Sequence, residues 1–131
     1  MTNKYVFDID IKRPIPKHFT VCEGDEGVEF EAHLLDGGDP ITLSLTTNMV
    51  YAVFVRSDGH VEVVTPESSL DWTTGGIVTM RVPPECFRTG TNSVVFQIYE
   101  QPTGSELFVL MATTCERRFY ARPSAPDATN N

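Results

Sequence analysis

The chain has 131 residues, a hydrophobic content of 40% and a formal charge of −8 at pH 7. This length suits one domain with a core of its own, without a disulfide or metal staple. The acidic excess weighs against nucleic acid as a partner, because phosphate binding needs clustered Lys and Arg. No segment approaches the ~20 apolar residues that cross a bilayer, so we expect no membrane partner.

Neither a signal peptide nor a disulfide framework is predicted. Acidic residues interrupt the only apolar run near the N-terminus, so this run does not resemble a signal sequence. The three cysteines, Cys22, Cys86 and Cys115, are odd in number and widely spaced. This pattern favours a reducing compartment and small buried thiols.

The first predicted element is an N-terminal strand or arm, residues 1–20. Its apolar residues Tyr5, Phe7, Ile9 and Ile11 alternate with Val6, Asp8, Asp10 and Lys12. This period of two predicts a half-buried strand, and the prolines at positions 14 and 16 end it. The strand either forms the edge of its own domain or adds to a neighbouring subunit's sheet, where Tyr5, Phe7, Ile9 and Ile11 would contact the partner.

Further short strands follow, separated by turns rich in Gly and Asp at 23–27 and 36–40. They are predicted at 19–22, at 28–34 and at 41–45, where Ile41, Leu43 and Leu45 alternate with polar residues. The next run, 49–55, is apolar almost throughout. That composition predicts a central strand covered on both faces.

A tight hairpin is predicted around Asp58 and Gly59, between the apolar runs 49–55 and 60–64. An Asp-Gly pair in this setting is typical of a type I′ turn, because both residues tolerate positive φ. The tip, Asp58, Gly59 and His60, is exposed in this interpretation and is a candidate contact surface for a partner.

The remaining strands are predicted at 77–82, 93–100, 107–112 and 117–120, with one helical turn within 85–90. About eight or nine short strands and no long helical period predict an all-β, antiparallel β-sandwich, immunoglobulin-like or jelly-roll-like, over residues 21–122. Residues 123–131 are polar and are interpreted as an extended tail.

No pattern of catalytic or metal-binding residues emerges. The three histidines lie far apart, and the chain has no CxxC, HExxH, nucleophile elbow or glycine-rich phosphate loop. Acidic residues in the turns 23–26 and 36–39 carry oxygen ligands suited to Ca²⁺ but lack a defined calcium-loop spacing. We therefore expect no enzyme and no cofactor, leaving a hydrolase with carboxylates that meet only in three dimensions as a minor alternative.

The single tryptophan, Trp72, suggests a second function class. An exposed Trp72, with Tyr51, Tyr99 and Tyr120, would stack on a sugar ring and make a carbohydrate-binding or adhesion module. The other interpretation is that Trp72 closes the open end of the sandwich.

The order of several features resembles a known family. These features are Glu23-Gly-Asp25, Val28 to Leu34, the loop 36–40, Tyr51 to Val55 with Ser57-Asp58-Gly59, Gly76 to Pro83, Thr89-Gly90, Ser93 to Glu100 and Cys115 to Ala121. Together they cover about Val21 to Arg122 and resemble the N-terminal domain of phage baseplate upper proteins.

This resemblance implies an immunoglobulin-like sandwich in the virion of a tailed bacteriophage, assembled in the host cytoplasm. Family members hold a receptor-binding or fibre module and continue into helices and a distal trimeric module. This sequence ends at Asn131, so we expect no such module in it. The resemblance therefore implies a small structural protein that docks on capsid, tail or baseplate proteins, or on its own copies, as an adaptor or a capsid decoration.

Overall fold

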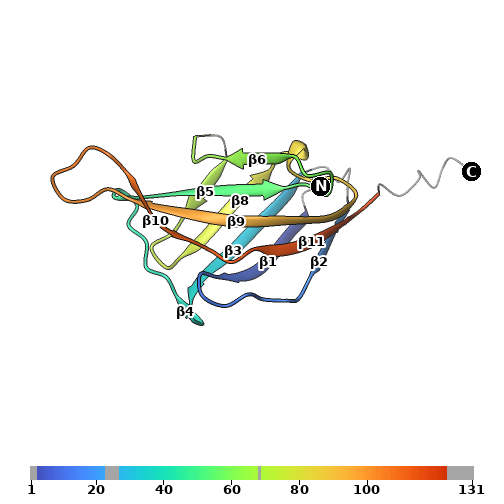
Figure 1. The fold of residues 1–131 in the computed structure, drawn as a ribbon, viewed down its shortest axis with the longest axis horizontal. Helices are drawn as coiled ribbons and strands as arrows, with labels where there is room; N and C mark the ends of the chain where they lie inside the picture. The colour runs from blue at the N-terminus through green and yellow to red at the C-terminus, as the bar shows by residue number, and fades with distance from the viewer. Residues whose placement is uncertain (1–2, 23–26, 68, 124–131) are drawn as a thin grey trace, which may run out of the picture.

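The computed structural model describes residues 3–22, 27–67 and 69–123, which form two β-sheets packed face to face (Figure 1). Its elements are β1 (Asn3–Asp10), β2 (Phe19–Cys22), β3 (Val28–Asp36), β4 (Asp39–Pro40), β5 (Asn48–Val55), β6 (Val61–Val64), β7 (Leu70–Trp72), β8 (Ile77–Val82), the 3₁₀ helix η1 (Pro84–Cys86), β9 (Gly90–Glu100), β10 (Val109–Thr113) and β11 (Arg117–Arg122). The predicted all-β sandwich is confirmed. Within these ranges no helix is long and apolar enough to span a membrane.

The first sheet has the strand order β1-β3-β8-β7, with β4 paired to β3, and the second has the order β2-β11-β9-β5-β6, with β10 paired to β9. Two pairings in the described region are parallel, β1 with β3 and β2 with β11, and the others are antiparallel. The expectation of purely antiparallel sheets is therefore corrected. Period-two alternation specifies the face of a strand but not the direction of its partner.

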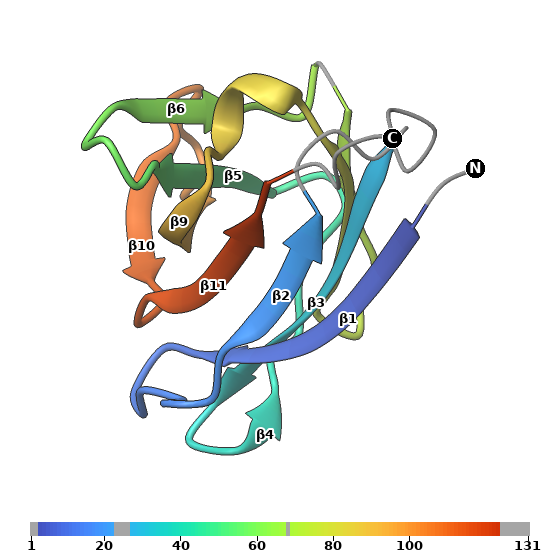
Figure 2. The same ribbon diagram turned by 90° about the vertical axis from the view of Figure 1, so that its right-hand side faces the viewer.

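The strand β1 is part of the sandwich itself. It pairs with β3 along its whole length, from Asn3 beside Val28 to Asp10 beside Leu35. The chain then crosses to the second sheet, and Figure 2 shows β1 and β2 side by side along one flank. The rings of Phe7 and Phe19 stack across this flank, with centroids 4.7 Å apart. The strand therefore closes one side of the core.

The core lies between the sheets and consists of the inward-facing residues of each strand. The largest fully buried side chains include Phe30, Phe54, Phe96 and Phe119. Each ring removes about 150–250 Å² of largely apolar surface from water, which dominates the hydrophobic stabilisation of the domain. The opposite residues of the same strands face outward and form the two outer faces of the molecule.

Three local predictions are corrected. Residues 41–45 form no strand; instead Leu43 is buried in the core on an irregular segment between the sheets. The strand β5 is buried on one face only, with inward residues fully covered and outward residues partly exposed. The hairpin after β5 is not a type I′ turn, because Gly59 has a φ of 89° and no described non-glycine residue has a positive φ.

The hairpin between β5 and β6 is a three-residue loop closed by its backbone. The N–H of Arg56 donates to the carbonyl of His60, and the N–H of Gly59 donates to the carbonyl of Arg56, both at 2.8 Å. A type I turn followed by a left-handed glycine has this arrangement. The sequence signal located the hairpin correctly because glycine is required in either geometry.

Asn92 fixes this hairpin to the start of β9. Its buried Oδ1 accepts N–H groups from Ser57 at 2.9 Å and Arg88 at 3.1 Å, and its Nδ2 donates to the carbonyls of Arg88 and Gly90. All of its side-chain hydrogen-bonding capacity is used, with two bonds on each amide atom. Asn92 therefore links the β5–β6 hairpin to the loop before β9 through hydrogen bonds on both of its amide atoms.

Candidate interaction surface

The outer face of the first sheet is charged. By register, its outward positions include Lys4, Asp8, Glu29, Glu31, His33, Asp71 and Arg81. Lys4 Nζ lies 2.8 Å from Glu31 Oε1, and His33 Nε2 lies 2.7 Å from Glu31 Oε2. These hydrogen bonds, from His33 first and then from Lys4, lower the pKa of Glu31 below its ordinary value. The Lys4–Glu31 pair joins β1 to β3, the His33–Glu31 contact lies within β3, and both suit a face that stays in water.

The outer face of the second sheet is apolar. We define the apolar face as the outward apolar residues Met49, Tyr51, Val53, Val55, Val61, Val63, Val95 and Tyr99, which the register of β5, β6 and β9 brings together. Two polar residues of β9 share this face, Ser93 beside Val55 and Gln97 beside Tyr51. Val55, Val61 and Val63 are 40%, 53% and 51% exposed. The rings of Tyr51 and Tyr99 pack edge to face, with centroids 5.3 Å apart.

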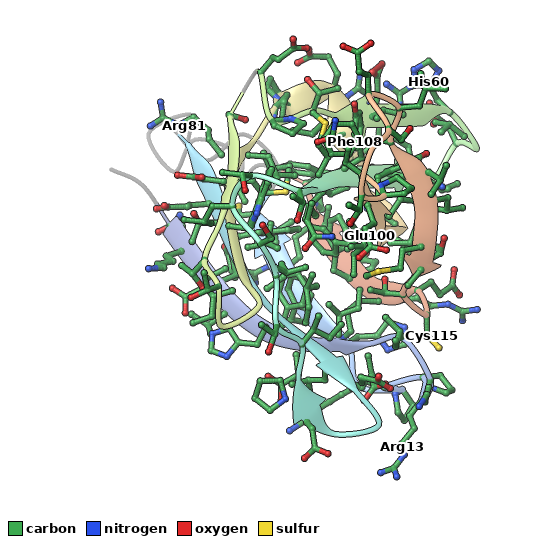
Figure 3. The ribbon with its side chains drawn as sticks, turned by 90° about the vertical axis from the view of Figure 1, so that its left-hand side faces the viewer. Arg13, His60, Arg81, Glu100, Phe108 and Cys115 are labelled. Atoms are coloured by element: carbon green, nitrogen blue, oxygen red, sulfur yellow. The ribbon has the colours of Figure 1, made fainter. Side chains whose placement is uncertain are left out.

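Charge is nearly absent from this side of the molecule. The charged residues at its outward strand positions are Arg118 and Arg122 on β11, beside the apolar face. Figure 3 shows Arg81 of the charged face and His60 of the β5–β6 hairpin on opposite sides of the molecule. This side therefore carries a largely apolar surface although the protein has a charge of −8.

A second exposed feature is β10 with the residues before it. We define the β10 edge as Leu107, Val109, Leu110 and Met111, which are 74%, 51%, 51% and 47% exposed. The hairpin from β9 to β10 projects beyond the rest of the fold (Figure 1). In the described residues β10 pairs only with β9, with a bulge between Leu110 and Ala112. Its outer side therefore offers unpaired backbone groups.

The composition of β10 differs from that of most other edge strands. Three of them, β1, β6 and β7, carry acidic residues, such as Asp8, Glu62 and Asp71, which discourage pairing with another chain. Residues 107–115 contain no charged residue and no proline. The bulge is the one protection that β10 carries, and it leaves the segment before Met111 regular enough to pair.

The four predicted contact residues of the N-terminal strand are buried or half-buried in the structure. Phe7 and Ile9 are 6% and 1% exposed and belong to the core, because the inward positions of β1 face the second sheet. Tyr5 is half-buried and its ring lies 6.2 Å from that of Phe19. Ile11 is half-buried just after the strand. The side chains of Tyr5, Phe7 and Ile9 pack against the core, so a neighbour would meet the outer backbone edge of β1.

The predicted hairpin tip is exposed, as expected. Asp58, Gly59 and His60 all reach solvent. Asp58 is held by an ion pair with Arg56, and His60 Nε2 lies 2.8 Å from Glu62 Oε1. The hydrogen bond from Arg56 is the main cause of the lowered pKa of Asp58. The tip lies at the opposite end of β5 from the β10 edge.

Trp72 points toward the interior. It is half-buried against the core, and its indole N–H donates to the carbonyl of Ser44 at 3.1 Å. Tyr51, Tyr99 and Tyr120 lie on the outer face of the other sheet. The structure does not bring these four rings together, and this arrangement matches the interpretation that Trp72 closes one end of the sandwich.

The described residues form no cluster of potential metal ligands. No group of three His, Cys, Asp or Glu side chains comes together there, and Glu23, Asp25 and Glu26 lie outside the described ranges. Cys22, Cys86 and Cys115 form no disulfide with one another, and burial raises the pKa of the Cys86 thiol to about 12, so this thiol is neutral.

The apolar face and the β10 edge are the features that sequence reasoning missed. The signal was present, since Val53, Val63 and Val95 occupy positions where a half-buried strand usually carries polar residues. Such apolar runs predict burial on both faces. An apolar run does not tell whether another element covers both of its faces. Only the arrangement of the assembled sheets shows this.

Comparison with known proteins gives a fold neighbour. No family model matches the chain, and no curated protein matches it. Among solved structures it is similar to the N-terminal domain of phage TP901-1 ORF48, with a TM-score of 0.71 and 12% sequence identity over 93% of this chain and 99% of that chain. At this identity the likeness shows a shared fold.

Proposed function

We propose that the chain is a non-enzymatic structural protein of a tailed-phage virion that binds other virion proteins through its β10 edge. Two independent lines support the proposal. The order of strand and turn motifs resembles the baseplate upper proteins, and the fold is similar to that of a phage domain. An immunoglobulin-like sandwich assembled into the particle in the host cytoplasm fits both.

The single observation that carries the proposal is the uncovered β10 strand. An uncharged edge strand with side chains exposed on both sides is a hazard for a free protein and a docking site for an assembled one. A partner strand added to this edge would gain main-chain hydrogen bonds and cover Val109 and Leu110. The exposed tip, Asp58 to His60, is a further proposed contact at the other end of the sheet.

We place the chain at the tail or baseplate, as an adaptor, because the family that its sequence resembles is a baseplate family. Decoration of the capsid is the other location that the test below distinguishes. The ring of Trp72 faces the core, so Trp72 does not support a carbohydrate-binding function.

The test is binding of the purified chain to phage particles that lack it. We expect the wild-type chain to co-sediment with particles and to appear at the tail end in cryo-electron microscopy. Val109→Asp places a charge on the β10 edge on the side away from the apolar face, because Val109 pairs with Glu100. It should weaken binding by about tenfold or more, since an unpaired charge would be buried.

The matched control is Val6→Asp, an equally polar change at a valine that is 59% exposed on the charged face. It should bind as the wild type does. A wild-type chain that never co-sediments would contradict the proposed function. Equal binding by Val109→Asp and the wild type would show that the β10 edge is not the binding site. Density on the capsid would show that the chain is a capsid decoration and not a tail adaptor.

A further inference from the structure

We infer that the apolar face binds a second copy of this chain, so that two sandwiches stack with their second sheets in contact. The inference goes beyond the proposed function, because it concerns a different surface and a contact that the purified chain makes alone. Its starting point is the register that gathers Tyr51, Val53, Val63, Val95 and Tyr99 on one uncharged face.

Stacking through the apolar faces minimises the electrostatic repulsion between two copies. A chain with a charge of −8 repels its own copies through most of its surface. When two apolar faces meet, the layer order is first sheet, second sheet, second sheet, first sheet. With about 10 Å between stacked sheets, the two charged faces lie about 30 Å apart, several times the Debye length of about 8 Å at physiological salt. Repulsion between them is largely screened.

The same argument excludes stacking of the apolar face on the charged face of the next copy. That arrangement would bury Lys4, Asp8 and Glu31, whose side chains are partly exposed to water. Removing charged groups from water costs more than an apolar partner returns. The pairing is therefore isologous, with the same patch on both copies, and it closes as a dimer instead of growing into a filament.

The size of the face suits a weak dimer. The apolar face spans three strands, of which β5 has eight residues and β6 has four. At about 4.8 Å between strands and about 3.4 Å per residue, the face covers roughly 300–400 Å² as a flat area. Protruding side chains increase its accessible area, but two copies bury less than the roughly 1,200–2,000 Å² of a standard interface, which is the range of weak, concentration-dependent association.

A row of three valines forms the centre of the proposed contact. Val53 on β5 pairs with Val95 on β9, and Val63 on β6 pairs with Val53. This row of three valines lies between the exposed pair of Val55 and Val61 and the edge-to-face pair of Tyr51 and Tyr99. Branched and aromatic side chains of this kind interdigitate when two sheets pack.

Sedimentation equilibrium of the full chain tests the inference. The wild type should shift from 14.6 kDa toward twice that mass as concentration rises, without larger species. Val63→Glu, at a site 51% exposed, should raise the dissociation constant by about tenfold or more, because the charge is buried twice in a two-fold contact. Val6→Glu on the charged face is the matched control and should dimerise like the wild type.

Thermal unfolding of both variants checks that they remain folded. A wild-type chain that stays at 14.6 kDa at every concentration would overturn the inference. So would equal dissociation of Val6→Glu and Val63→Glu, or growth into species larger than a dimer. Because only purified chain is used, a failure here is distinct from failure to bind particles.

Discussion

The two outer faces of the sandwich arise from the same strand pattern and differ in what stands at the outward positions. On the first sheet, Lys4 of β1 pairs with Glu31 of β3, and His33 contacts Glu31 along the same strand. On the second sheet, Val53, Val63 and their neighbours leave an uncharged surface. The inward faces are alike, so the difference contributes nothing to how the core is built.

This difference suggests that the two outer faces have different roles, one in contact with water and one in contact with a partner. Surface ion pairs contribute little to the free energy of unfolding. Their charged side chains favour contact of the first sheet with water over burial against a partner. Exposed valines on the second sheet also contribute little to a monomer, since their surface remains in contact with water. Their effect appears only when a partner covers them, and the following predictions separate these contributions.

The largest expected effect comes from Asp10, which anchors the charged sheet at its edge. Its buried carboxylate accepts backbone N–H groups from Lys12, Arg13, Gly37 and Gly38 at 2.7 to 3.2 Å. Asp10→Asn replaces an acceptor oxygen with a donor and should lower the free energy of unfolding by about 2–4 kcal/mol in urea titrations. Asp8→Asn, on the exposed side of the same strand, is the control and should change little.

The same anchor predicts a pH dependence. Burial by itself would raise the pKa of Asp10, but the four backbone N–H donors together lower it below its ordinary value of 3.8. Its stabilisation is therefore present above about pH 4 and is lost as the pH falls through the lowered pKa. The difference between the wild type and Asp10→Asn should shrink in acid, and a difference that stays constant to low pH would contradict this role.

A smaller effect is expected at the hairpin that carries Val61 and Val63 of the apolar face. Gly59 has a φ of 89°, a conformation that a β-branched residue adopts only under strain. Gly59→Val should lower stability by about 1–3 kcal/mol, measured by thermal unfolding. His60→Ala, one residue further along, should stay within about 0.5 kcal/mol of the wild type. Equal stability of the two variants would show that the turn geometry is not needed.

A change of surface chemistry with little change of fold is expected from the double variant Val61→Lys, Val63→Lys. Both sites are about half exposed, so each change should cost no more than about 0.5 kcal/mol of stability. Retention on a phenyl resin should fall clearly, since the apolar patch is interrupted. Unchanged retention would show that this face is not the main apolar surface of the protein.

The smallest effect is expected on the charged face itself. Glu31→Gln removes the carboxylate that pairs with Lys4 and His33, and it should change the melting temperature only slightly, less so at high salt. Because the pKa of Glu31 is lowered, its contribution is lost as the pH falls through that pKa. An NMR titration of Glu31 in the wild type and in Lys4→Met measures the shift. An unchanged pKa in the variant would contradict the pairing.

Much of the fold could be predicted from the sequence because alternation is a local signal. The buried residues of β3, β8 and β9 follow the period of two except at the strand ends, and the Asp-Gly pair marks the hairpin. The parallel pairings of β1 with β3 and of β2 with β11 could not be predicted in this way. Alternation within a strand does not tell which strand lies beside it or in which direction that strand runs. Leu43 was assigned to a strand for a similar reason, because an irregular segment crossing the sandwich also buries alternate residues.

The candidate surface was harder to predict than the fold. Residues 49–55 and 107–112 are apolar in either interpretation, and only the assembled structure shows that nothing covers Val53 on one side or Leu110 at the edge. Conversely, the apolar residues of β1 suggested a partner contact, and the structure uses Phe7 and Ile9 in the core. Exposure is a property of the assembled sheets, and sequence alternation alone does not determine it.

The most direct test measures the solvent exposure of valine methyl groups by NMR, with a soluble paramagnetic probe, as the concentration of the purified chain rises. The account predicts that Val55, Val61 and Val63 become protected while Val6, on the charged face, stays exposed. Protection of Val6 to the same degree, or continued exposure of all four methyl sites at the highest concentration, would contradict the claim that the second sheet is the face of assembly.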